Sequence, residues 1–294
     1  MGIEVGPKFN PEEQDPPTPK TETEKVKNIK PETKKAGGII RNFLDTRSQR
    51  KKQEKVRFQE GQWGDYDSEF WHFAGFFAEC LPEEYKHKGW EEGLKSYIEN
   101  TLSREETTDQ REKSKLTAVE FGGPGSKFFR GFSNGFFEKT IGVCLVDIRG
   151  ENLKNEDSSL NHYVVAGNIL GADTNETLNE VKTMLDTTKV DLIVSRMQGA
   201  LKGMDMNLLD DAVRQWYALL NENGVMFIQY NWASSSDKRE DNVAAKCIEM
   251  IKGKYPQLDV QLGRGVMRLH KKLDDPEQLP ENAHFFVQNP DQNI

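Results

Sequence analysis

The residues best suited to hold a ligand form a short run in the middle of the chain, residues 119–126, with the sequence VEFGGPGS. Glycines at such a turn permit unusual backbone angles and let the main chain approach a ligand closely. An acid directly before them, here Glu120, can pair with an ammonium group. The run therefore indicates a binding turn, and on these residues alone a Gly-Pro turn that holds no ligand stays the alternative.

Two further positions carry side chains that suit an adenosine. Asp147 directly follows the apolar residues 141–146, and a carboxylate there can accept both ribose hydroxyls, each bond contributing about 1.5–3 kcal/mol. Asn168 and Ile169 follow another apolar run, residues 163–166. The amide could bond the amino group of adenine, and the isoleucine could pack on the adenine ring. An Asp that ends a strand and an Asn in a turn are both commonplace, so neither position is specific by itself.

The elements that must position these residues alternate along the chain from residue 116. Short apolar runs alternate with helical patterns, which is typical of parallel strands joined by crossover helices. The expected strands are residues 116–121, 141–147, 163–166, 190–195 and 225–230, and the expected helices are residues 177–185, 208–220 and 238–252. Residues 258–262, a tight turn and residues 266–269 then predict an antiparallel hairpin. Ligands bind beyond the carboxyl ends of parallel strands, so we expect the residues after these strands to meet.

The succession of Glu120 with its glycines, Asp147, and Gly167 with Asn168 resembles the class I S-adenosylmethionine-dependent methyltransferase family. The separations are about 27 and about 21 residues, and the resemblance covers residues 116–269. It implies an α/β fold with a doubly wound, seven-stranded, mostly parallel sheet that ends in an antiparallel hairpin, and S-adenosylmethionine as the cofactor. It also implies that the glycine run lies under the methionine portion, that Asp147 holds the ribose, and that Asn168 takes the position of the family's adenine-binding acid.

Two sets of site residues follow from the residues and the resemblance together. The expected cofactor-binding residues are Glu120, Gly122, Gly123, Gly125, Asp147, Asn168, Ile169 and Ser195. The expected substrate-facing residues follow the fourth and fifth strands and are Arg196, Gln198, Tyr230, Asn231 and Trp232. For the last three residues, a capped strand end with a packed aromatic ring is an equal alternative. No catalytic residue is assigned, because displacement at a carbon activated by sulfonium needs placement of the nucleophile and exclusion of water more than a base.

Some features depart from the family pattern. The glycines at 122–125 are compressed by one residue relative to the family's alternating loop, and Gly131 and Gly135 weaken the first crossover as a helix by about 1 kcal/mol each. His162, at the start of a strand, is expected to have an ordinary surface or capping role. A nicotinamide-binding Rossmann domain is the nearest competitor. It is disfavoured because Phe128 stands where G-x-G-x-x-G requires a small third residue.

Composition divides the 294 residues into three segments. Residues 1–56 are rich in Pro, Lys and Glu and predict a disordered basic tail. Residues 57–115 are expected to form a helical segment, because between Ser68 and Thr101 apolar side chains recur at three- and four-residue steps and predict two helices interrupted near Pro82. The aromatic residues at 70–77 fit helical core packing better than a lid over a pocket. Residues 116–294 are expected to form the methyltransferase-like domain.

Charge and cysteine usage limit the classes of partner. The net charge of -8 combines about +5 through Arg57 with about -13 beyond it. An acidic body argues against broad binding to phosphate backbones, although the basic residues 47–55 could contact nucleic acid or an acidic partner. Three cysteines without CxxC or Cys/His spacing favour neither a disulfide framework nor a metal site. The absence of a signal-peptide pattern and of a bilayer-length apolar run predicts a cytoplasmic protein with no membrane partner.

The function predicted from these residues is that of an S-adenosylmethionine-dependent methyltransferase acting on an unidentified acceptor. The chain lacks the Asn-Pro-Pro-Tyr type of motif for amino methylation of bases and the Pro-Cys pair of cytosine C5 enzymes. Two alternatives stay open: a non-catalytic methyltransferase-like binding module, and a nucleic-acid-associated protein that uses its basic tail.

Overall fold

The computed structural model describes residues 68–103, 116–144, 161–167, 169, 174–196, 205–231, 239–280 and 283–287. These residues all belong to one compact unit, Leu44–Ile294. The predicted tail at residues 1–56 lies outside the described residues, and so do four predicted site residues: Asp147, Asn168, Gln198 and Trp232.

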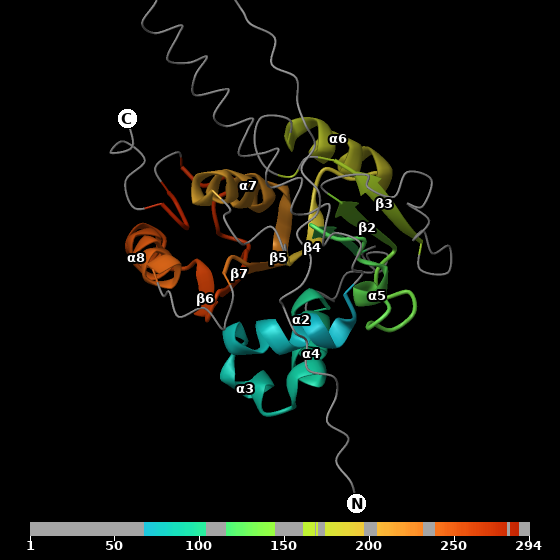
Figure 1. The fold of residues 1–294 in the computed structure, drawn as a ribbon, viewed down its shortest axis with the longest axis horizontal. Helices are drawn as coiled ribbons and strands as arrows, with labels where there is room; N and C mark the ends of the chain where they lie inside the picture. The colour runs from blue at the N-terminus through green and yellow to red at the C-terminus, as the bar shows by residue number, and fades with distance from the viewer. Residues whose placement is uncertain are drawn as a thin grey trace, which may run out of the picture. The chain divides into compact units, whose positions relative to one another are not determined.

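A seven-stranded sheet with the order β3-β2-β1-β4-β5-β7-β6 forms the centre of the unit (Figure 1). The strands are β1 Thr117–Phe121, β2 Lys139–Cys144, β3 His162–Ala166, β4 Val190–Arg196, β5 Leu220–Gln229, β6 Asp259–Gly263 and β7 Val266–His270. The pairs from β3 through β5 are parallel, whereas β7 runs antiparallel to both β5 and β6. The predicted doubly wound sheet with a terminal antiparallel hairpin is thereby confirmed.

The order of the strands places a topological switch point between β1 and β4. The chain passes from β1 outward to β2 and β3 and then returns to the other side of β1 as β4. In open α/β sheets the crossover connections on either side of such a point diverge, and a ligand crevice opens at the carboxyl ends of the two strands. The site is therefore expected after Phe121 and Arg196, the residues that end β1 and β4.

Helices cover both faces of the sheet. They are α2 Phe70–Phe77, the 3-10 turn η1 Ala78–Cys80, α3 Glu83–Lys86, α4 Trp90–Leu102, α5 Ser126–Phe129, α6 Thr174–Leu185, α7 Met206–Leu219 and α8 Arg239–Lys254. Side chains alternate between the faces along each strand. In β4, Leu192 and Val194 pack with residues of α2, α4 and α5, while Ile193 packs with residues of α6, α7 and α8. Figure 1 shows α2 and α4 on one side of the sheet and α6 and α7 on the other.

Aromatic side chains join the helical segment to the sheet. The ring centroids of Phe73 and Phe128 are 4.5 Å apart, and those of Phe77 and Phe227 are 5.2 Å apart. Phe73, Phe77, Phe128 and Phe227 are all fully buried. Aromatic rings bury large areas and gain further from tilted or offset contacts. The rings of α2 thus form one hydrophobic cluster with α5 and β5, as the sequence predicted for core packing.

The first crossover contains a much shorter helix than a parallel crossover usually has. α5 spans only Ser126–Phe129, and the chain leaves helical geometry before Gly131. A Cβ atom at Gly131 would lie 2.4 Å from Cδ2 of Phe70, so glycine is needed where this turn passes α2. Gly135 adopts a φ of 77°, which also favours glycine. The two glycines that weaken this crossover in the sequence therefore mark where its helix stops.

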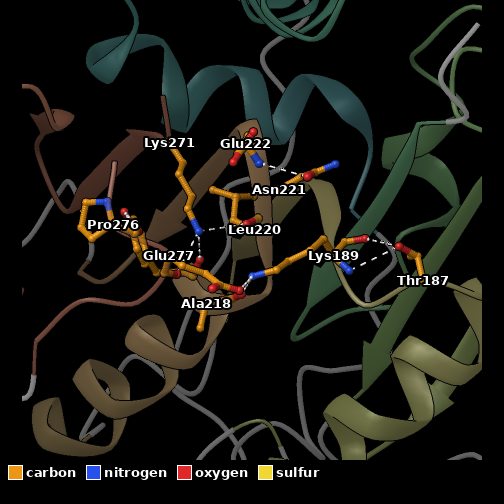
Figure 2. A network of polar contacts seen from close by, with 10 residues as sticks. Thr187, Lys189, Ala218, Leu220, Asn221, Glu222, Lys271, Pro276 and Glu277 are labelled. Atoms are coloured by element: carbon orange, nitrogen blue, oxygen red, sulfur yellow. Dashed lines mark hydrogen bonds and ion pairs between the residues drawn. The ribbon is translucent and has the colours of Figure 1, made fainter. Parts of the chain in front are cut away.

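Two lysines close the carboxyl end of α7 at the edge of the sheet where β4 and β5 begin (Figure 2). Nζ of Lys271 donates to the carbonyl oxygens of Tyr217 at 3.3 Å, Leu220 at 3.2 Å and Glu277 at 3.0 Å. Nζ of Lys189 donates to the carbonyl of Ala218 at 2.6 Å and pairs with Oε1 of Glu277 at 3.0 Å. Cations are favourable at a helix carboxyl terminus. This network stabilises the edge of the sheet opposite the switch-point crevice.

Candidate functional site

The backbone between β1 and α5, residues 122–125, is called here the glycine loop. Gly122 and Gly125 have φ values of 99° and 78°, in a region that glycine occupies at little cost. The amide of Gly122 donates to the carbonyl of Val143 at 2.8 Å, and the amide of Phe129 donates to the carbonyl of Gly125 at 3.0 Å. The loop is thus tied to β2 at its start and to the first turn of α5 at its end.

Glu120 is buried beneath the glycine loop. A Cβ atom at Gly123 would lie 2.3 Å from Oε1 of Glu120, and one at Gly125 would lie 3.2 Å from Oε2. Only 2% of Glu120 is exposed. Glycine at both positions therefore lets the loop close over the carboxylate. The predicted pairing of Glu120 with a ligand ammonium stays a prediction.

The middle of the loop lies on β2 and reaches His162. A Cβ atom at Gly142 would lie 1.7 Å from the carbonyl oxygen of Pro124, and Nε2 of His162 lies 2.8 Å from that oxygen. His162 is 1% exposed, so the expected surface role for this residue is wrong. The loop folds back over the sheet face far enough to cover the start of β3. A glycine inside a predicted strand, Gly142, is a sequence signal for such a close approach.

Ser195 lies near the end of β4, next to the residue of β1 that precedes the glycine loop. It pairs in register with Phe121 of β1 and with Ile228 of β5. Its side chain is fully buried, and its Oγ has no hydrogen-bond partner among the described residues. Buried hydroxyl groups in folded proteins almost always have a partner. Ser195 therefore presents at the switch point a buried polar atom that the described part of the chain leaves without a partner.

Arg196 follows Ser195 and points to the opposite face of the sheet, beneath α2. Its Nη1 donates to Oγ of Ser68 at 2.9 Å, and its guanidinium carbon lies 4.4 Å from the ring centroid of Phe76. Stacking of a guanidinium on an aromatic ring is favourable, more so when water is excluded. Burial lowers the pKa of His72, and the positive charge of Arg196 lowers it further. Arg196 is thus a buried cation between the end of β4 and α2.

Gln229, a residue that the sequence did not single out, lies next to Arg196. The two pair in register across β4 and β5. The amide Nε2 of Gln229 donates to the carbonyl of Asn231 at 3.3 Å, while its buried Oε1 has no hydrogen-bond partner in the part of the chain that the structure describes. Gln229 follows the apolar residues 225–228 at the end of β5, and a polar residue at that position is its sequence signal.

The predicted substrate-facing residues after β5 have different surroundings. Tyr230 is buried, its ring centroid lies 5.1 Å from that of Phe286, and burial raises its pKa well above the usual range. Asn231 is partly exposed, and its backbone N–H donates to the carbonyl of Gly265 at 3.1 Å. Tyr230 packs in the core as described, which matches the alternative of a capped strand end. A substrate-facing role for either residue stays a prediction.

The carboxyl end of β3 approaches α6 closely. The amide of Gly167 donates to the carbonyl of Cys144 at 2.9 Å, and a Cβ atom at Gly167 would lie 2.4 Å from Oγ1 of Thr177. Ile169 is fully buried and belongs to the core on the α6 side. Its predicted contact with an adenine ring stays a prediction.

Two general properties concern the described residues only. None of their His, Cys, Asp and Glu side chains form a group of three or more that could hold a metal ion. No helix among them is both long and apolar enough to cross a lipid bilayer.

Comparison with known proteins gives likeness of structure only. No family model and no curated protein matches the sequence. The MycE methyltransferase of mycinamycin biosynthesis, solved with Mg and SAH, is 12% identical, with a TM-score of 0.37 over 69% of this chain and 52% of that one. The sugar N-methyltransferase KedS8 from Streptoalloteichus is 12% identical, with a TM-score of 0.37 over 60% and 86%. DesVI from Streptomyces venezuelae is 14% identical, with a TM-score of 0.34 over 64% and 95%.

The chain spans about half the length of MycE, at 52%, and 55% of CalS10 from Micromonospora echinaspora, another similar structure. At these identities and TM-scores, the strand order of the chain itself carries the assignment. A seven-stranded sheet with the switch point between β1 and β4 and an antiparallel β7 gives this chain the fold of the class I S-adenosylmethionine-dependent methyltransferases.

Proposed function

We propose that this protein is an S-adenosylmethionine-dependent methyltransferase that acts on an acceptor still to be identified. One observation carries the proposal: the glycine loop follows Phe121 of β1, and Ser195, the residue of β4 that pairs with Phe121 at the switch point, has a buried Oγ without a hydrogen-bond partner among the described residues. In this class of sheet the ligand crevice opens at that point.

The residues at the switch point are suited to the cofactor. Gly122 and Gly125 adopt positive φ values, and because glycine has no Cβ atom the main chain of the loop can approach a ligand closely. Ser195 offers a buried hydroxyl that has no hydrogen-bond partner among the described residues. In the proposal, these residues hold the cofactor together with five other residues: Glu120, Gly123, Asp147, Asn168 and Ile169. Asp147 binds the ribose hydroxyls, and Asn168 and Ile169 bind the adenine.

The bound cofactor would supply a methyl group on a sulfonium centre. The protein then has to place the acceptor atom in line with that group and to keep water out. Arg196 and Gln229 lie side by side at the end of the sheet, with Phe76 stacked on the guanidinium. In the proposal, these polar groups orient the acceptor on the α2 side. Gln198, Tyr230, Asn231 and Trp232 are further candidates for the acceptor side.

Calorimetric titration with S-adenosylmethionine and S-adenosylhomocysteine tests the cofactor. We expect the unmutated protein to bind and Asp274→Ala to bind equally well. Asp147→Ala should bind at least tenfold more weakly, because a tenfold loss of affinity corresponds to about 1.4 kcal/mol, which is less than the loss of one charge-assisted hydrogen bond. Asp274 is an exposed aspartate after β7 and serves as the matched control. If the unmutated protein gives no heat with either ligand, the proposal is wrong. If Asp147→Ala binds normally, the ribose is held elsewhere.

Turnover separates the enzyme from the two alternatives. A methyltransferase transfers labelled methyl groups to some acceptor in a fractionated metabolite or macromolecule pool. A non-catalytic binding module binds S-adenosylmethionine without any turnover. A nucleic-acid-associated protein shows salt-sensitive binding to nucleic acid that is lost on removal of residues 1–56.

A further inference from the structure

The carbonyl of Pro124, in the middle of the glycine loop, is turned toward the face of the sheet. A Cβ atom at Gly142 would lie 1.7 Å from its oxygen, so the oxygen occupies the space that a side chain on β2 would fill. A backbone carbonyl in such a place needs a hydrogen-bond donor, because leaving it unsatisfied is costly. The loop itself is a poor source of rigidity, since Gly122 and Gly125 have positive φ values and glycine is the most flexible residue.

His162 provides a donor for this carbonyl. Its Nε2 lies 2.8 Å from the oxygen of Pro124, and its Nδ1 lies 2.8 Å from Oγ1 of Thr140. A carbonyl oxygen can only accept, so Nε2 carries the hydrogen. In a neutral imidazole Nδ1 then accepts, and the hydroxyl of Thr140 donates to it. The Pro124 carbonyl therefore sets the tautomer, and the hydroxyl of Thr140 satisfies the other ring nitrogen and helps to orient the imidazole.

The same imidazole also contacts the helix after the loop. The ring centroids of His162 and Phe129 of α5 are 5.7 Å apart, and His162 is 1% exposed. The start and the end of the loop are held by backbone hydrogen bonds, from Gly122 to Val143 and from Phe129 to Gly125. The bond from His162 holds its middle.

We infer that His162 is a positioning residue for the ligand site: by donating to the Pro124 carbonyl, it fixes the glycine loop in the conformation that binds the cofactor. His162 lies at the start of β3 and acts through the loop without touching the ligand. The link from loop to cofactor rests on the proposed function, whereas the link from His162 to loop does not.

The experiment compares His162→Leu, which has no donor, with His162→Gln, whose amide can donate in place of Nε2. Tyr163→Phe is the matched control, because it removes a neighbouring hydrogen bond on β3, from Tyr163 to Asn161 at 2.9 Å, that does not involve the loop. Hydrogen exchange of peptides that cover residues 121–131 is measured on the full chain without ligand. Calorimetry then gives the dissociation constant of S-adenosylmethionine for each variant.

We expect loop amides to exchange about tenfold faster in His162→Leu and the dissociation constant to rise about tenfold, the size expected for one buried carbonyl that loses its donor. His162→Gln should stay within about threefold of the unmutated protein in both measurements, and Tyr163→Phe should match it. Peptides from β1 and β4 should keep their protection in every variant.

Three results would overturn the inference. The first is normal hydrogen exchange of the loop in a folded His162→Leu variant, and the second is equal loop exchange in the Leu and Gln variants. The third is faster exchange across the whole sheet in His162→Leu, which would mean a purely structural role. If His162→Leu does not fold, Thr140→Val and His162→Gln decide. The inference then requires faster loop exchange in Thr140→Val and near-normal exchange in His162→Gln. If the unmutated protein does not bind S-adenosylmethionine, the proposed function fails while the exchange data still decide the role of His162.

Discussion

At the scale of single residues, Gly142 and Gly253 offer the same substitution with opposite expected effects. Gly142→Ala would place a Cβ atom 1.7 Å from the Pro124 carbonyl oxygen, so the glycine loop would have to move. We expect the free energy of unfolding to fall by about 1–3 kcal/mol, as for other overpacked sites. Gly253 lies in α8, and a Cβ atom added there would meet no atom within 4 Å, so Gly253→Ala should raise that free energy by up to about 1 kcal/mol. Urea denaturation measures the free energy of unfolding of both variants. Equal changes in Gly142→Ala and Gly253→Ala would contradict the close approach of the loop to Gly142.

The titration of Lys271 predicts a dependence of stability on pH. Burial, and next the charge of Lys189, lower the pKa of Lys271 from 10.5 to about 8. Between pH 8 and 10.5 the unfolded chain therefore binds more protons at this residue than the folded chain does, so stability from this group rises with pH across that window. Below pH 8 the lysine is protonated in both the folded and the unfolded state, so it does not make the free energy of unfolding depend on pH.

Lys271→Met removes this titration and serves as the comparison. The variant also loses the hydrogen bonds to three carbonyls, so it should be less stable throughout. Melting temperatures measured from pH 7.5 to 10 should show the difference between the two proteins widening as the pH rises. A difference that is constant or that narrows would show that the lysine is not buried as described.

The roles of individual residues were predictable only where they follow from position along a strand. Ser195 and Arg196 were expected at the end of the fourth strand, and both lie there. Strand geometry puts these consecutive residues on opposite faces, but which face each one takes depends on how the helices pack on the sheet, and the sequence pattern does not reveal this. The burial of Glu120 and His162 depends on the return of the glycine loop over β2, a tertiary contact between segments that the sequence separates by about forty residues.

At the scale of elements, the strands were the most predictable feature, because buried parallel strands are nearly continuous apolar runs. Their ends were less so. The fifth strand was expected to begin at Val225, yet β5 begins at Leu220, which pairs with Val190 of β4. The intervening polar residues Asn221 and Glu222 are exposed, and they join the strand through backbone pairing that no hydropathy pattern signals.

The segment at residues 283–287 is attached to α7 through one buried aspartate. Oδ1 of Asp210 accepts the backbone N–H of Phe285 at 2.6 Å and that of Phe286 at 2.9 Å, and Oδ2 lies 2.6 Å from Nδ1 of His284. Asp210→Ala would leave both buried amides without their acceptor. We expect a loss of about 2–4 kcal/mol in the free energy of unfolding.

Chymotrypsin provides a direct measure of this attachment, since both phenylalanines are buried. Cleavage after Phe285 and Phe286 should be much faster in Asp210→Ala than in the unmutated protein, as mass spectrometry of the products would show. Asp211→Ala changes the neighbouring, exposed aspartate and should leave the cleavage rate unchanged. Similar rates in the two variants would mean that other contacts hold the segment.

At the scale of the whole molecule, the sheet separates two polar regions at opposite edges. The lysine network closes the edge where β4 and β5 begin, and the glycine loop, Ser195 and Arg196 lie at the edge where β1 and β4 end. The first is fully explained by helix termination and needs no ligand. The second contains buried polar atoms, such as Oγ of Ser195, that the described residues do not satisfy. A ligand that binds the folded chain should therefore act on the second edge and stabilise the entire unit.

Ligand-induced stabilisation gives a prediction that separates the methyltransferase from its nearest competitor. A ligand at one hundred times its dissociation constant stabilises the folded state by about 2.7 kcal/mol, which for a domain of this size corresponds to a rise in melting temperature of about 5–10 °C. We expect such a rise with S-adenosylhomocysteine and none with NAD or NADP at matched concentrations, measured by differential scanning fluorimetry. Phe128, which packs against Phe70 with ring centroids 5.3 Å apart, occupies the place where a dinucleotide-binding turn requires a small residue. A rise with NAD and none with S-adenosylhomocysteine would assign the switch point to a dinucleotide and would reverse the proposed function.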